Sequence, residues 1–288
     1  MLITSMVLYG TIGVFRHYIP LPSGLIACAR GLIGALSLML ILLILRKKPD
    51  RTAIRRNFLP LAVSGAALGA NWVLLFEAYS RTTVAVATLA YYFAPILLLI
   101  IAPFALKELL TLRKVLCIFV ALAGMVLISG VIGGGISGLS GIAFALGAAL
   151  LYPVIVLLSK KTTEVNAFDK SIVQLLFAAA VTLPYTLFAE KWSFSDFTRK
   201  AAILLLTVCV VHTGIAYALY FGALRALKAQ TLAILSYIDP LVAVLLSALV
   251  LREPFGWPEA VGAVLILGAA LISELPERRN NDVPTSGG

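Results

Sequence analysis

Four ionisable side chains lie inside long apolar stretches of this 288-residue sequence and are its first candidates for chemistry: Arg30, Glu77, His212 and Asp239. Apolar surroundings disfavour a charged group, and the centre of a membrane helix does so by about 2.5 to 3.5 kcal/mol on insertion scales. Each of these side chains therefore needs a partner or a water-filled cavity.

Asp239 directly precedes Pro240. Proline has no N–H to offer the carbonyl four residues earlier, here that of Ser236, so this carbonyl can meet a ligand or a water. We interpret Asp239 as a carboxylate that binds a substrate amine or carries a proton. The alternative is a purely structural carboxylate that is satisfied by the hydroxyls of Ser236 or Tyr237.

His212 is expected near the middle of its apolar segment, either as a hydrogen-bonded packing residue or in the wall of a cavity. The other histidine, His17, lies at the edge of a segment, so no metal site and no cofactor are expected. The three cysteines have no metal-ligand spacing and are interpreted as small buried residues: Cys28, Cys117 and Cys209.

Other polar and aromatic side chains are expected at similar depth, and they complete the candidate substrate site: Asn71, Trp72, Tyr91, Tyr92, Tyr152, Tyr217 and Tyr237. A single aromatic residue in a membrane helix is more often a packing residue. Their concentration near two prolines nevertheless favours a cavity that stacks flat or apolar substrates.

Arg30 and Glu77 are predicted to form a gate ion pair. Arg30 is expected about 9 Å from one end of its helix, and Glu77 in the last turn of the next helix at that same end. Removing one partner of such a pair leaves an unpaired charge in a low dielectric. In the alternative, Arg30 reaches out to lipid headgroups and Glu77 meets water.

The composition points to a membrane protein. Hydrophobic residues make up 61% of the chain, charged residues 12%, and the mean hydropathy is +1.03. A soluble domain of this length could not bury so much apolar surface. The net charge of +10 comes from loops between apolar segments, so it indicates membrane topology and not nucleic-acid binding.

The chain contains an internal duplication. The stretch 86–114 is repeated at 231–259, with Pro95 matching Pro240 and Glu108 matching Glu253, each 145 residues apart (240 − 95, 253 − 108). The two prolines are predicted to be hinges, with tolerated kinks as the alternative. The two glutamates are expected to cap loops or to form gate ion pairs with local basic residues, and not to touch the substrate.

Apolar segments of about 20 residues predict an all-α integral membrane protein with ten transmembrane helices in two five-helix repeats. The repeats are expected at 1–131 and 132–276, followed by a disordered tail at 277–288. The first helix is not interpreted as a signal peptide. The expected helices are 1–14, 24–45, 58–79, 84–106, 114–130, 139–158, 171–189, 201–224, 231–250 and 258–275.

Five helices per repeat is an odd number, so the second repeat must enter the membrane inverted. Most of the 23 lysines and arginines then fall on the side that holds both termini, which predicts cytoplasmic termini in the cell membrane. The basic loop 46–56 sets this topology and can also contact anionic lipid. Inverted repeats are typical of secondary transporters, whose substrate site lies where the repeats meet. Within the third helix, Gly65-x-x-x-Gly69 predicts close approach of another helix.

The order and repetition of these features resemble the EamA-type members of the drug/metabolite transporter superfamily. The resemblance covers the whole chain, from Tyr9-Gly10-Thr11 and Arg30 to Gly268. It implies a transporter, usually an exporter, of small organic metabolites such as amino acids, with a central cavity lined by helices one, three, four, six, eight and nine. The chain departs from the pattern at Tyr152-Pro153, so no specific role is carried over there.

The sequence has no phosphate-binding loop and no clustered His, Asp and Glu residues, which argues against an enzyme. An ion channel or lipid scramblase is the alternative function, although a single Asp per chain does not supply rings of charge around a pore. The expected partners are a small-molecule substrate and the lipid bilayer. The chain is expected to work as a monomer or a homodimer.

Overall fold

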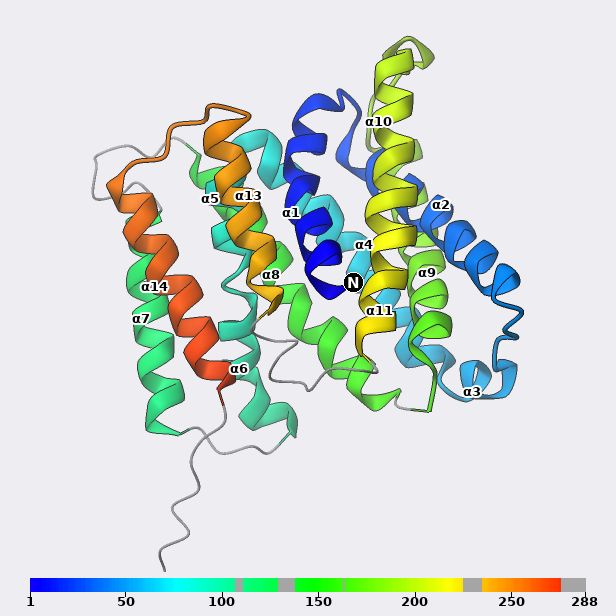
Figure 1. Cartoon of the computed structure of the whole chain (residues 1–288), viewed down its shortest axis with the longest axis horizontal. Coiled ribbons are helices and arrows are strands. Elements are labelled where there is room, and N and C mark those ends of the chain that lie inside the picture. The colour runs from blue at the N-terminus through cyan, green and yellow to red at the C-terminus, as the bar shows by residue number, and fades with distance from the viewer. Residues whose placement is uncertain (107–110, 129–137, 163, 225–234, 276–288) are drawn as a thin grey trace, which may run out of the picture.

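The structure is a computed structural model that describes residues 1–106, 111–128, 138–162, 164–224 and 235–275. In this part of the chain every regular element is a helix, and most helices run along a common direction (Figure 1). Five helical spans here are long and apolar enough to cross a membrane: Ser23–Ile44, Phe58–Arg81, Leu139–Ser159, Ala167–Phe188 and Arg199–Tyr220.

The first half of the chain contains α1 (Leu2–Tyr18), α2 (Ser23–Ile44), α3 (Arg51–Arg56), α4 (Phe58–Arg81), α5 (Val84–Tyr91), α6 (Ala94–Leu106) and α7 (Leu112–Ile128). The α1 helix ends later than the sequence predicted. The short α3 was not predicted, because it lies in the basic stretch 46–56, which has the composition of a loop. Asp50 caps it by accepting hydrogen bonds from the backbone N–H groups of Thr52 and Ala53.

The second half contains α8 (Leu139–Lys161), α9 (Ala167–Phe188), the 3₁₀ turn η2 (Phe194–Asp196), α10 (Arg199–Cys209), the π-helical segment η3 (Val210–Ile215), α11 (Ala216–Leu224), α13 (Ile238–Leu249) and α14 (Trp257–Glu274). The α9 helix begins earlier than predicted, at Ala167, and the side chain of the preceding Asn166 accepts a hydrogen bond from the Asp169 N–H.

The predicted fourth helix is not continuous. It breaks at Tyr92 and Phe93, between α5 and α6, just before Pro95. In the second half a turn at Tyr237 stands before Pro240 in the same way. Tyr92 and Tyr237 are 145 residues apart (237 − 92), so the same position of both copies departs from the helix.

Helices of the first half pack directly on helices of the second: α1 on α13, α2 on α9, α4 on α8 and α9, and α7 on α14. Figure 1 shows α7 beside α14 at one edge of the bundle. Glycines allow the closest contacts. A Cβ atom on Gly65 would lie 2.6 Å from the Gln174 carbonyl oxygen, and one on Gly69 would lie 2.7 Å from that of Ala178. The predicted close approach at these glycines is therefore confirmed, and the partner is α9.

Large apolar side chains cover the outside of the bundle, among them Leu43, which is 72% exposed, and Phe188, which is 89% exposed. A surface of this kind is unfavourable in water and suits the acyl chains of a bilayer.

Some of the predictions lie outside the described residues. These are the Lys107-Glu108 turn, the glycine-rich connection at 131–138 except for its last residue, the boundary between 131 and 132, and the tail at 277–288.

Candidate functional site

The Asp239 carboxylate lies in the first turn of α13 and contacts the break between α5 and α6. The Tyr92 hydroxyl donates a hydrogen bond of 2.7 Å to Asp239 Oδ2, and the Tyr92 and Tyr237 rings lie 6.4 Å apart. Asp239 thus has a hydrogen-bond partner in the other half of the chain. A carboxylate in the first turn of a helix is also favoured by the helix dipole.

The α1 helix lies close to this carboxylate through its Tyr9-Gly10-Thr11 segment. A Cβ atom on Gly10 would lie 2.6 Å from the Asp239 carbonyl oxygen, so only glycine allows this approach. Next to it, the Tyr9 ring packs edge-on against Tyr217 at 5.8 Å between ring centroids and is tilted against Tyr220 at 6.5 Å. Tyr217 is therefore part of an aromatic group beside Asp239.

On the α4 side, Asn71 is only 2% exposed and donates a hydrogen bond of 2.6 Å to the Ala148 carbonyl of α8. The Tyr91 and Tyr92 rings at the helix break are perpendicular, 6.0 Å apart. Asn71 thus links α4 to α8 and presents little surface of its own.

Arg30 does not form the predicted ion pair with Glu77. Glu77 pairs at 3.0 Å with Arg81, one turn along the same helix. The Arg30 Nε donates a hydrogen bond of 3.0 Å to Thr213 Oγ1, and its Cζ lies 4.0 Å from the centroid of the Trp72 ring. The prediction paired the two residues because they were expected at the same depth, but depth does not tell which face of its helix a residue occupies. Arg81 lies on the same face of the same helix as Glu77 and pairs with it instead.

His212 is 1% exposed and lies in the π-helical segment η3. Its Nε2 is 2.7 Å from Thr11 Oγ1, its Nδ1 is 3.4 Å from the Thr207 carbonyl oxygen, and the Phe15 ring packs against it at 4.6 Å. Both ring nitrogens have protein partners, which fits the packing alternative and not a cavity wall. The described residues contain no group of three His, Cys, Asp or Glu residues placed to hold a metal ion.

An open pocket of about 520 Å³ lies at the upper end of the bundle, the end where α1 finishes and where the α13–α14 connection lies in Figure 1. Its lining residues are Arg16, His17, Tyr79, Ser80, Arg81, Thr82, Thr83, Gly138 and Glu253.

Glu253 links the two halves of the chain beside this pocket. Its Oε2 accepts hydrogen bonds from the Val84 N–H, at 2.8 Å, and from the Ser247 hydroxyl. The Ser247 Oγ in turn accepts a hydrogen bond of 3.3 Å from the Ala85 N–H. Arg252 adopts a left-handed φ of 54°, which turns the chain back toward α13. The expectation that Glu253 caps a loop is thus corrected, because it caps α5 in the other half.

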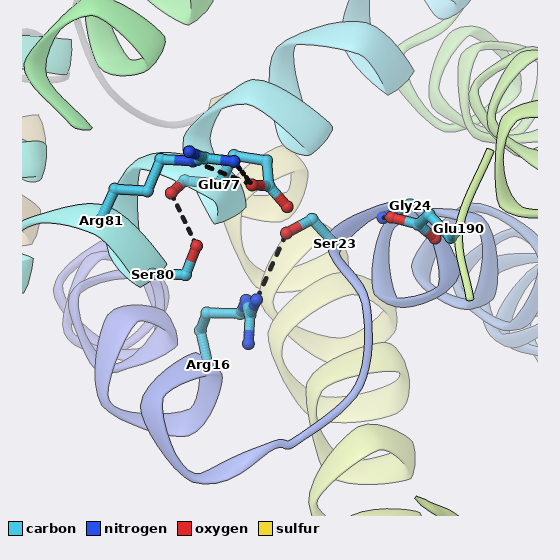
Figure 2. Close-up of polar contacts among 7 residues, drawn as sticks. All are labelled: Arg16, Ser23, Gly24, Glu77, Ser80, Arg81 and Glu190. Carbon is cyan, nitrogen blue, oxygen red and sulfur yellow. Dashed lines mark hydrogen bonds and ion pairs between the residues drawn. The ribbon is translucent and has the colours of Figure 1, made fainter. Parts of the chain in front are cut away.

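Figure 2 shows the polar contacts near this pocket. The Arg16 Nη1 donates to the Ile19 carbonyl at 3.0 Å and its Nη2 to the Ser23 hydroxyl at 3.3 Å. Glu190 accepts hydrogen bonds from the Gly24 and Leu25 N–H groups at the start of α2, at 2.7 Å and 3.0 Å. The upper end therefore holds two helix starts, those of α2 and α5, each capped by a glutamate from the second half.

The structure brings four of the predicted site residues together at the helix break: Tyr91, Tyr92, Tyr237 and Asp239. The others have different neighbours: Trp72 lies against Arg30, Tyr217 packs on Tyr9, His212 contacts Thr11, and Asn71 bonds to α8, the helix that holds Tyr152.

Sequence reasoning missed Tyr9, Thr11, Tyr79 and Thr213 as candidate site residues. Tyr9 and Thr11 stand in the segment that carries the family resemblance, which is a usable signal. Tyr79 and Thr213 carry no such signal, because only their contacts with Thr88 and Arg30 show their place.

In the part of the chain that the structure describes, a helical bundle with an apolar surface and long apolar helices is the build of a multi-pass membrane protein. Comparison with known proteins agrees. The model of the EamA-like transporter family matches residues 1–130 and 139–274, and the chain belongs to this family.

Similar proteins include the uncharacterized transporter YxxF of Bacillus subtilis, 28% identical over 99% of this chain and 92% of the relative. An uncharacterized transporter of Vibrio cholerae is 30% identical over 75% of this chain and 70% of the relative. A solved crystal structure shares the fold with a TM-score of 0.66 and 19% identity, covering 93% of both chains.

Proposed function

We propose that the protein is a secondary transporter that exports small organic metabolites such as amino acids by alternating access. The observation that carries this proposal is the contact between Tyr92 and Asp239, which joins the two interrupted helices of the two halves. Interrupted helices that meet between repeats are where transporters of this kind bind substrate.

Two inverted five-helix repeats, 1–131 and 132–276, form the proposed framework. The helix contacts support it because they occur in related pairs: α1 packs on α13, and the matching element α8 packs on α5 and α6. The same holds for α4, which packs on α8 and α9. Its matching elements in the second half are η3 and α11, which pack on α1, and η3 also packs on α2. The two separate stretches matched by the family model support the same division.

Alternating access requires one end of the bundle to open while the other closes. At the upper end Glu253 joins the two halves, and this contact must break for that end to open. Pro95 and Pro240 are the proposed hinges, since each follows a departure from the helix at the same position of its copy.

The upper end is proposed to face the outside of the cell, with both termini in the cytoplasm, from the distribution of lysines and arginines. The candidate site lies within one chain, so a monomer can carry substrate and a homodimer is not required. The lipid bilayer and the transported small molecule are the proposed partners.

Counterflow in liposomes tests the proposal. Purified protein is reconstituted with an internal pool of one metabolite at a time, and uptake of the labelled metabolite is followed. A carrier gives saturable uptake that the internal pool stimulates, and Asp239→Asn abolishes it while Glu164→Gln, a change at an exposed carboxylate, does not. Ohmic conductance, or lipid movement without solute dependence, would instead establish a channel or a scramblase.

A further inference from the structure

The stretch 46–56, between α2 and α4, gathers basic side chains on the surface of the molecule. It holds six cations, all of them exposed: Arg46, Lys47, Lys48, Arg51, Arg55 and Arg56. Its one acidic residue is Asp50, so the formal charge of the stretch is +5 (six minus one). The Asp50 carboxylate is already engaged, because its Oδ1 accepts hydrogen bonds from the Thr52 and Ala53 N–H groups at the start of α3.

The apolar face of α3 fixes the stretch to the bundle. Ala53 is buried against Leu61 of α4 and Val165 of the α8–α9 connection, and Ile54 packs against the same group. The basic stretch is thus attached to an element of each half of the chain.

A hydrogen bond strengthens the attachment to the second half. The Asp50 N–H donates to Asp169 Oδ2 at 2.9 Å, and Asp169 is buried in the first turn of α9. Arg51 and Arg55 are one turn apart on the exposed face of α3, where two like charges repel each other. The cations are therefore held outward on a fixed support, and an anion placed against them would relieve their repulsion.

Apolar side chains flank the basic stretch on both sides. Leu43 and Ile44 at the end of α2 and Leu59 at the start of α4 are each at least 70% exposed. Both helices are long and apolar enough to cross a membrane, and Figure 1 shows α3 between them at the lower end of the bundle. The cations thus lie where two spans end, at the level of lipid phosphates.

Arg46 has a backbone conformation that glycine adopts more easily. It follows the end of α2 with a φ of 53°. Its N–H donates to the Leu43 carbonyl and that of Lys47 to the Leu42 carbonyl, each at 3.0 Å. Glycine is the usual residue at this position of a helix end, because a side chain disfavours the left-handed conformation. The backbone therefore does not require a cation at residue 46.

We propose that the stretch 46–56 is a binding site for anionic phospholipids. The headgroup phosphate lies against the basic side chains, and the acyl chains lie along the exposed apolar residues at the adjoining ends of α2 and α4. Clusters of about four to eight Lys and Arg residues beside a membrane helix are typical of such sites. Because the stretch is attached to both halves, a bound lipid stabilises their packing at the lower end. The inference does not depend on which solute the protein carries.

Thermal unfolding of the full chain in a neutral detergent measures the binding. The probes are phosphatidylglycerol, phosphatidylcholine with the same acyl chains, and glycerol 3-phosphate, which has the phosphate without the chains. Phosphatidylglycerol should raise the Tm by several degrees more than phosphatidylcholine, because a ligand of the folded state stabilises it. Glycerol 3-phosphate should change the Tm little. Raising the ionic strength from about 0.05 M to about 0.5 M should weaken the effect of phosphatidylglycerol several-fold.

A matched pair of double variants locates the site. Lys47→Gln with Lys48→Gln removes two cations of the stretch, and each cation near an anionic surface contributes about a fivefold factor in affinity. The phosphatidylglycerol concentration at half-saturation should therefore rise about tenfold or more. Lys191→Gln with Arg199→Gln removes two exposed cations near the upper end and should bind as the wild type does.

Arg46→Gly separates lipid binding from folding and topology. It keeps five of the six cations, so membrane insertion should be that of the wild type even where the double variant inserts poorly. Its Tm without added lipid should equal or exceed that of the wild type, because glycine suits the left-handed conformation. Its affinity for phosphatidylglycerol should nevertheless fall about fivefold.

Equal stabilisation by phosphatidylglycerol and phosphatidylcholine would overturn the proposal, and the stretch would then serve topology alone. Wild-type affinity for phosphatidylglycerol in both Arg46→Gly and the Lys47, Lys48 variant would do the same. An equal loss in the Lys191, Arg199 variant would show a response to overall charge and not a site. Stabilisation by glycerol 3-phosphate that matches that by phosphatidylglycerol would indicate a site for soluble anions in place of lipid.

Discussion

Glu253 offers a sharp test of how the two halves are joined. In Glu253→Ala the Val84 N–H and the Ser247 hydroxyl lose their shared acceptor, and both residues are fully buried. Water cannot easily replace the carboxylate at either donor. The α5 helix also loses the negative charge at its N-terminus.

The expected loss of stability follows from these contacts. A hydrogen bond to a charged group contributes about 1.5 to 3 kcal/mol, and a buried donor left unsatisfied costs about 1 to 3 kcal/mol. For Glu253→Ala we expect a loss of about 3 kcal/mol in the free energy of unfolding. At about 2 to 4 °C per kcal/mol for a chain of this size, the Tm should fall by about 6 to 12 °C.

Two further variants calibrate this value. Glu253→Gln keeps one acceptor oxygen but not the charge, so about half of the loss is expected. Glu259→Ala removes a cap within a single helix, in which Glu259 Oε2 accepts from the exposed Gly256 N–H at 2.9 Å. That change should cost about 0.5 to 1 kcal/mol.

Thermal unfolding of the purified protein measures the stability, and labelling measures the opening of the upper end. The native cysteines are all buried, so a cysteine placed at Thr82, in the pocket lining, gives a specific site for a maleimide that does not cross membranes. Glu253→Ala should label several-fold faster than its parent. A Tm within 1 °C of the parent together with an unchanged labelling rate would refute the role of Glu253 as a contact between the halves.

Three other changes test the remaining assignments. Pro95→Ala and Pro240→Ala should each lower the transport rate several-fold with normal membrane insertion, and the hinge assignment is wrong if both carry solute at the original rate. Tyr92→Ala should weaken substrate binding more than Tyr92→Phe in a thermal-shift titration; equal losses would assign the effect to the hydroxyl and not to the ring. Gly69→Val should lower the Tm by more than 5 °C or prevent folding, because its Cβ would meet the α9 backbone at 2.7 Å. Gly147→Ala, where the Cβ would meet a leucine methyl group at 3.4 Å, is the control and should change the Tm little.

Much of the fold could be predicted from the sequence because bilayer thickness and hydropathy act on each segment locally. The apolar segments, the two prolines and the close contact at Gly65 and Gly69 all leave a signal within a few residues. Helix ends were less accurate, since Asp50 and Asn166 start helices through side-chain caps among charged residues that look like loop.

The partners of the site residues were harder to predict, because a partner depends on the rotation of each helix as well as on depth. Arg30 and Glu77 were matched by depth, yet Arg30 faces Trp72 and Thr213 while Glu77 faces Arg81. Predicting these faces needs the neighbouring helices, which come from distant parts of the chain.

The two halves share their scaffold but not their charges, and this difference bears on mechanism. Tyr92 and Tyr237 occupy the same position of both copies, and their rings meet. Asp239, in contrast, matches Ala94 (239 − 145), and Arg30 matches Leu175 (30 + 145). The proposed alternating access requires similar bends in both halves, and the helix breaks that the two copies share would supply them. Asp239 and Arg30 have no counterpart in the other copy, so any role that they have in the proposed transport would differ between the halves.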